Sequence, residues 1–134
     1  EPKQTLLVAL KEKLETVGGL HVAVYAGTSA SGLFAMIPDL PPPFAVVAYF
    51  GTEYYTAAPS RATPDIHVIV GCLAPTDAWD PDKTDIFRLT DEVITTVDYQ
   101  ILVGDAFIRV ASDTTMDIDP ALSMTDIAFT ILDH

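Results

Sequence analysis

The sequence predicts a single α+β domain, in which two helices pack on one face of a mainly antiparallel β-sheet. Two segments carry apolar residues at helical spacing, one near the start of the chain and one in its second half. Several other runs are alternating or wholly apolar and are bounded by Gly, Pro and Asp, which is typical of strands. The 134 residues are enough for one packed core, and no repeat or linker divides them.

The first predicted helix spans residues 2–17. Leu6, Leu10 and Leu14 recur every four residues and form one apolar stripe, while lysines and glutamates take the remaining surface. Gly18 and Gly19 provide a suitable C-terminal stop.

The second predicted helix begins near Asp80 and ends near Val97. Asp80 is expected to be the N-cap, and Pro81 suits the first helical position. Its expected buried stripe consists of Ile86, Leu89, Val93, Ile94 and Val97.

The remaining apolar runs are expected strands. In chain order they are residues 20–25, 44–51 and 66–74, a hairpin over 99–110 that turns at Gly104 and Asp105, and a last strand over 124–133. Residues 27–43 are expected to be a long irregular segment, part of which could be a short strand. Residues 51–65 and 112–123 are expected to be polar connections. Three prolines, 41–43, are expected to hold the chain in an extended polyproline form before the strand at Phe44.

The composition excludes several classes of protein. The formal net charge is −12, and the seven basic residues do not cluster, so direct nucleic-acid recognition is not expected. No apolar run is long enough to span a membrane, and no signal peptide is visible. The single cysteine, Cys72, lies in an apolar strand and is expected to be buried and inert in a reducing compartment.

The sequence shows no catalytic signature, so neither an enzyme nor a cofactor or metal site is expected. His21 and His67 each lie in a predicted strand, and no further His or Cys stands beside either of them at metal-ligand spacing. An alternative remains open: a small-molecule-binding or enzymatic α+β domain with a pocket near these two histidines.

Several apolar and aromatic residues in predicted loops have no evident place in a small core, and such residues often mark protein contacts. We therefore expect an interface with copies of the chain or with another protein. Its candidate residues are Leu33, Phe34, Met36, Ile37, Tyr54, Tyr55 and Trp79.

The order of these elements resembles a known family. An amphipathic helix closes with TVGGLHVAVY, a Pro-led strand PPPFAVVAYFG and a strand IHVIVGCLA follow, and a second helix precedes a hairpin and the final strand MTDIAFTILD. This arrangement is similar to the tail terminator, or tail-completion, proteins of long-tailed bacteriophages and related prophages. The likeness covers nearly the whole chain but contains no diagnostic motif, and no functional residue is transferred from it.

The resemblance implies a structural protein that forms a ring, usually of six copies. Such a ring ends polymerisation of the tail tube and offers a surface for head joining. The implied partners are the chain itself, a tail tube protein and a head-completion protein. The implied location is the cytoplasm during assembly and then the virion tail. Another virion component, such as a head–tail connector or a baseplate protein, is the nearest alternative.

Overall fold

A computed structural model describes residues 2–25, 30–54, 62–74, 85–98, 100, 102–103, 106–116 and 121–132. The helices are α1 (Pro2–Leu14), α2 (Ala30–Met36), the short 3-10 helix η1 (Ile37–Asp39) and α3 (Ile86–Val97). The strands are β1 (His21–Tyr25), β2 (Phe44–Tyr54), β3 (Ala62–Leu73), β4 (Leu102–Val103), β5 (Ala106–Met116) and β6 (Leu122–Leu132).

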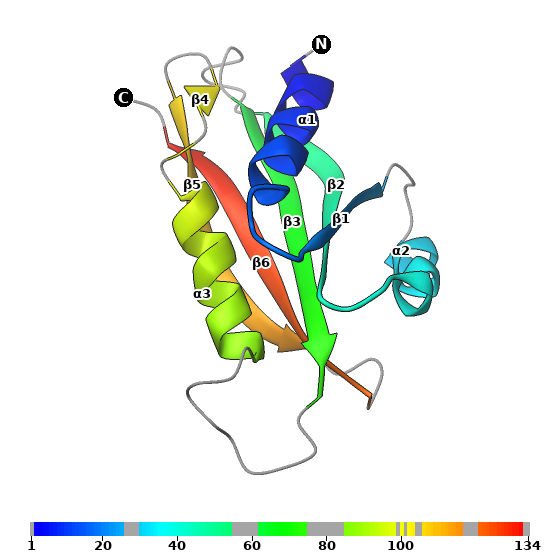
Figure 1. The fold of residues 1–134 in the computed structure, drawn as a ribbon. Helices are drawn as coiled ribbons and strands as arrows, with labels where there is room; N and C mark the ends of the chain where they lie inside the picture. Colours follow the sequence, from blue (N-terminus) through cyan, green and yellow to red (C-terminus); the bar gives the residue numbers. More distant parts are fainter. Residues whose placement is uncertain are drawn as a thin grey trace.

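The six described strands form one sheet in the order β1-β2-β3-β6-β5-β4 (Figure 1). β1 runs parallel to β2, and every other neighbouring pair is antiparallel. The sheet is therefore mainly antiparallel, and with its helices it confirms the predicted α+β class.

Helices α1 and α3 cover one face of the sheet, as the sequence predicts. Leu10, Leu14 and Val93 have no exposed surface there, and burying each such side chain contributes roughly 1.5–3 kcal/mol. The buried core on this face consists of Leu6, Leu10, Leu14, Ala45, Val47, Ile66, Val68, Val70, Cys72, Leu89, Val93, Val97, Ile108, Ile127 and Phe129.

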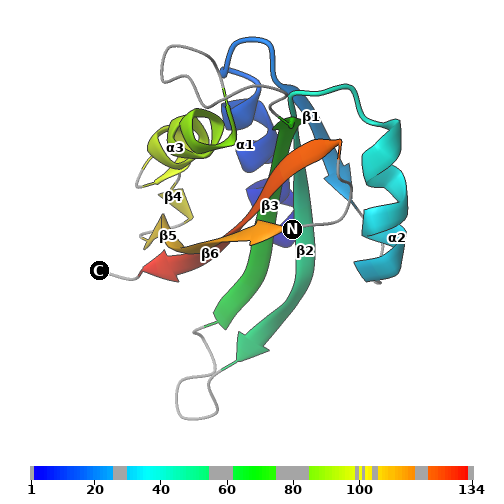
Figure 2. The ribbon, with the colours of Figure 1, turned by 90° about the horizontal axis from the view of Figure 1, so that it is seen from below.

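A third helix, α2, covers part of the opposite face, so the expectation of an irregular loop or short strand was wrong for residues 30–39, while residues 27–29 lie outside the described residues. Leu33 and Ile37 are fully buried against Phe44, in a second core that also contains Val46, Ala48, Ile69 and Met124. The spacing of Leu33, Met36, Ile37 and Leu40 is helical, and the Gly, Ser and Pro residues around them obscured it. In Figure 2, α2 lies beside the β1–β2 edge, apart from α1 and α3.

Two helix boundaries differ from the prediction. α1 ends at Leu14, and the next residues form turns up to Gly19, whose φ of 76° favours glycine. α3 begins at Ile86 because Asp85 is its N-cap, with a carboxylate that accepts a hydrogen bond from the Arg88 N–H at 3.0 Å. The predicted cap, Asp80, and Pro81 lie outside the described residues.

Both predicted polar connections contain more strand than expected. β2 continues to Tyr54 and β3 starts at Ala62, so part of the 51–65 connection is paired. β5 continues to Met116, and residues 112–116 pair with β6 where a polar link was predicted. Main-chain pairing does not require apolar side chains, which explains both errors. The Pro42–Pro43 peptide is cis, so the lead-in to β2 differs from the regular polyproline helix that was expected.

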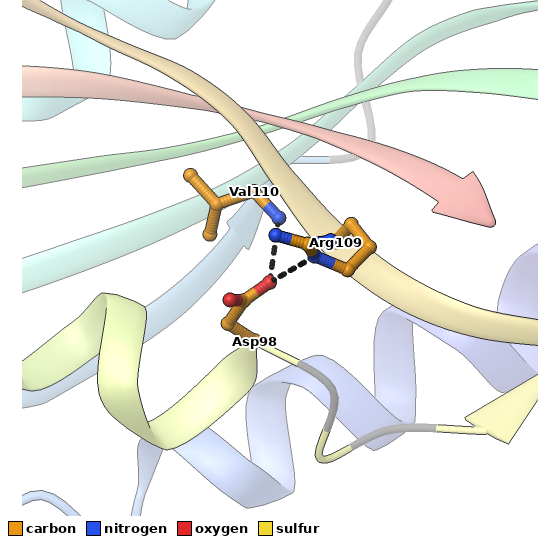
Figure 3. Close-up of polar contacts among 3 residues, drawn as sticks. All are labelled: Asp98, Arg109 and Val110. Carbon is orange, nitrogen blue, oxygen red and sulfur yellow. Dashed lines mark hydrogen bonds and ion pairs between the residues drawn. The ribbon is translucent and has the colours of Figure 1, made fainter.

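The C-terminal end of α3 is fixed to β5 by one carboxylate. Asp98 Oδ1 accepts hydrogen bonds from the Val110 N–H at 3.0 Å and from Arg109 Nε at 3.1 Å (Figure 3). Beside these bonds the register of β5 shifts between Val110 and Ser112. The described residues of β4 pair with Ala106 and Phe107 and do not reach Val110, so Asp98 satisfies a main-chain donor at the edge of β5.

Candidate assembly surfaces

The strands β2 and β3 extend past their neighbours as a two-stranded ribbon, which we define as residues 51–54 and 62–65. β1 pairs with β2 only as far as Ala48, and β6 pairs with β3 only from Ile66. Beyond these points β2 and β3 pair only with each other among the described residues, through four register pairs from Gly51–Asp65 to Tyr54–Ala62. In Figure 2 the ribbon extends beyond the rest of the sheet, on the side away from α1 and α3.

The local sequence suits an extension of this kind. The register shifts between Tyr49 and Gly51, and such irregularities bend and twist a strand at its base. Pro64 lies within β3 opposite Thr52, where proline is tolerated because no third strand pairs with it in the described part of the chain. The ribbon is about 10 Å long at 3.4 Å per residue.

One of the two predicted interface tyrosines, Tyr54, lies at the far end of this ribbon. Tyr54 is the last residue of β2, although the structure describes only its main chain, and Tyr55 lies outside the described residues. Trp79 also lies outside them, and Phe34 is described only as a main-chain residue of α2.

Two of the predicted interface residues are not available to a partner. Leu33 and Ile37 have no exposed surface, because they fill the second core against the sheet. Met36 is half-buried and packs on the same cluster. The expectation that these residues lack a place in the core was therefore wrong.

Two large apolar side chains are exposed toward the opposite end of β3. Leu73 ends β3 with 69% of its surface exposed, and Phe87 in the first turn of α3 is 67% exposed. Figure 1 shows that β3 ends and α3 begins at the same end of the molecule. Sequence reasoning missed both residues, because Leu73 continues an apolar run and Phe87 adjoins a predicted buried stripe.

Comparison of the sequence with models of known protein families and with curated proteins gave no match. The function must therefore be argued from the surfaces of the chain itself.

The histidine pocket considered as an alternative does not form around both histidines. His21 on β1 pairs with Phe44, and His67 on β3 pairs with Ala48 from the other side of β2. The two histidines are therefore separated by four residues, or about 13 Å, along β2. His67 Nδ1 instead lies 2.7 Å from Asp126 Oδ1 on β6. His21 Nδ1 lies 3.2 Å from the Pro43 carbonyl oxygen.

The reactive side chains that are described give little support to a catalytic site. Cys72 is buried, as predicted, and burial together with the Asp85 carboxylate raises the pKa of its thiol. A raised pKa keeps the thiol protonated and weakly nucleophilic near neutral pH. Among the described residues, no three His, Cys, Asp or Glu side chains are grouped to hold a metal ion. No helix of the described chain is long and apolar enough to cross a membrane.

Proposed function

We propose that this chain is a structural protein of a phage or prophage tail, acting as a tail terminator. Copies of it would form a ring that ends tail-tube polymerisation and presents a surface for head joining. The observation that supports this most is the ribbon, which extends the sheet where neither β1 nor β6 accompanies it.

A projecting ribbon is an unfavourable feature for a protein that acts alone. A two-stranded hairpin is at best marginally stable in water, because half of its main-chain groups and both of its faces lack sheet neighbours. It becomes stable when another surface packs on it or another strand pairs with its edge. We infer that the ribbon contacts a neighbouring molecule.

The position of the two surfaces favours a ring over a two-fold dimer. The ribbon lies at the start of β3 and the exposed side chain of Leu73 lies at its close, so the two are different surfaces at opposite ends of one strand. When one surface of a copy binds a different surface of the next copy, the assembly closes into a ring or continues as a filament. A terminator requires the closed form.

The acidic charge is compatible with this role. A net charge of −12 repels DNA phosphates within a Debye length of about 10 Å at 0.1 M salt. DNA could then pass through the lumen of a ring without adhering to it. The proposed partners are a tail tube protein and a head-completion protein, and the proposed final location is the virion tail.

The test is a ribbon-deletion variant observed by negative-stain microscopy and multi-angle light scattering. Gly51 and Asp65 are register partners, so an Asn-Gly turn can replace residues 52–64 and join the two strands directly. The described core residues are all retained, so we expect a folded monomer, whereas we expect the unaltered chain to form rings alone or on tail tubes. Asp39→Asn, at an exposed site on η1, is the matched control and should keep the rings.

Two results would contradict the proposal. One is a ring that persists after the ribbon is deleted. The other is an unaltered chain that stays monomeric and leaves tail-tube length unchanged when added to polymerising tube protein. Rings that form but bind a baseplate or head protein instead of the tube would favour one of the other virion roles.

A further inference from the structure

An open groove of about 670 Å³ lies between the turn that follows α1 and the outer face of α3. One wall is formed by Thr16, Val17 and Gly18, and the other carries side chains from successive turns of α3. The groove residues on α3 and its cap are Asp85, Phe87, Arg88, Asp91, Glu92, Thr95 and Thr96. None of these features was predicted from the sequence.

The outer face of α3 is unusual because a large aromatic side chain adjoins the charged residues. The helix buries Leu89, Val93 and Val97 against the sheet, which leaves Phe87 67% exposed at the edge of the groove. Exposed aromatic residues beside a concavity are frequent anchors of protein contacts. Phe87 thus provides an apolar platform to which a partner side chain can pack.

The charge of the groove indicates what kind of partner fits. Among the described lining residues, three carboxylates, from Asp85, Asp91 and Glu92, face the groove against the guanidinium of Arg88. Residues 11–15, at the end of α1 and the start of the turn after it, add no net charge, because their two lysines are balanced by two glutamates. The groove is therefore acidic in a chain that is itself strongly acidic.

We propose that this groove binds a basic segment of another protein, with Lys or Arg side chains facing the carboxylates and an apolar or aromatic side chain on Phe87. A second copy of this chain is a poor occupant, since its seven basic residues are scattered through the sequence. Opposite charge on the two partners speeds encounter and selects the partner, while the apolar anchor supplies much of the affinity. This inference rests on the proposed assembly role. It assigns a second binding site, the groove, to a protein other than the neighbouring copy that the ribbon contacts.

The test uses a defined probe, the peptide Lys-Phe-Lys-Leu-Lys-Phe-Lys with blocked ends, titrated into the ¹⁵N-labelled protein at 0.15 M salt, where the Debye length is about 8 Å. We expect the largest amide shifts at residues 16–18 and along 87–96. Phe87→Ala should weaken binding about tenfold, as truncation of an anchor residue does. Asp91→Lys/Glu92→Lys should weaken it to a similar degree, because both side chains are exposed and can be reversed without disturbing the core.

The matched control is the double reversal Asp39→Lys/Asp113→Lys, which changes the net charge equally at exposed sites on η1 and β5. It should leave binding within about twofold, because neither side chain lines the groove and salt screens exposed charges that the peptide does not contact. A heptalysine peptide, which lacks the aromatic and leucine side chains, should bind at least fivefold more weakly.

Three results would overturn the inference: no binding of the probe, shifts spread over the whole acidic surface, or equal losses in the two double reversals. Equal affinity for heptalysine would show general charge attraction and would overturn it as well. Ring formation by the unaltered chain and its loss on ribbon deletion are independent of these outcomes, so failure of the groove leaves the proposed function standing.

Discussion

At the scale of single residues, Gly71 shows how closely the two layers of the second core approach. Gly71 lies in the middle of the sheet opposite Phe44, whose ring covers it. A Cβ added at this position would lie 2.8–2.9 Å from both Cε atoms of that ring. Phe44 has no exposed surface and is held in the second core by Leu33 and Ile37, so the ring cannot move away freely.

We therefore expect Gly71→Ala to lower the free energy of unfolding by about 1–3 kcal/mol through overpacking. Urea denaturation followed by circular dichroism measures this change. In Phe44→Leu, which removes the ring, the same Gly71→Ala change should cost markedly less. An equal cost in both backgrounds would show that the backbone, and not the Phe44 ring, requires glycine.

At the scale of elements, α2 behaves as part of the core and not as a docking loop. Leu33 is its fully buried anchor, and Leu→Ala changes at such positions cost about 2–5 kcal/mol. We expect Leu33→Ala to lower the midpoint of urea unfolding accordingly, while the intact ribbon still supports assembly of the molecules that remain folded. Lost assembly at unchanged stability would instead restore Leu33 as an interface residue.

The connection between α3 and β5 also acts at this scale. Asp98 serves both a main-chain donor and the Arg109 side chain, and its side chain is only 24% exposed. Asp98→Ala should cost about 1–3 kcal/mol, because it leaves the Val110 N–H without its acceptor. Asp98→Asn keeps an acceptor oxygen and should cost less. The hydrogen exchange rate of the Val110 amide, measured by NMR, should rise in the Ala variant and rise less in the Asn variant. An unchanged rate in the Ala variant would contradict this role of Asp98.

The elements that the sequence predicted are those whose burial leaves a periodic pattern. The leucine stripe of α1 and the continuous apolar run from Phe44 to Ala48 were sufficient to predict a helix and a central strand. The ribbon and the second half of β5 could not be predicted, because their pairing is made by main-chain groups beneath polar side chains. The groove depends on how the turn after α1 approaches α3, which is a tertiary contact between residues about seventy positions apart.

At the scale of the whole molecule, charge and assembly oppose each other. Every ring contact brings together two copies that each carry a net charge of −12. Their repulsion acts over a Debye length of roughly 30 Å at 0.01 M salt but only about 8 Å at 0.15 M. The groove has the reverse dependence, since a basic partner is attracted to it and salt weakens that attraction.

We therefore expect self-association to strengthen several-fold as NaCl rises from 10 to 150 mM, while binding of the basic peptide weakens over the same range. Sedimentation velocity measures the first and fluorescence titration the second, both at pH 7.5. The ribbon-deletion variant should stay monomeric throughout and should still bind the peptide, because the groove lies between α3 and the turn that follows α1. Self-association that weakens with salt would mean that the ring contact is itself an attraction between opposite charges, and the ribbon would then no longer suffice to explain it.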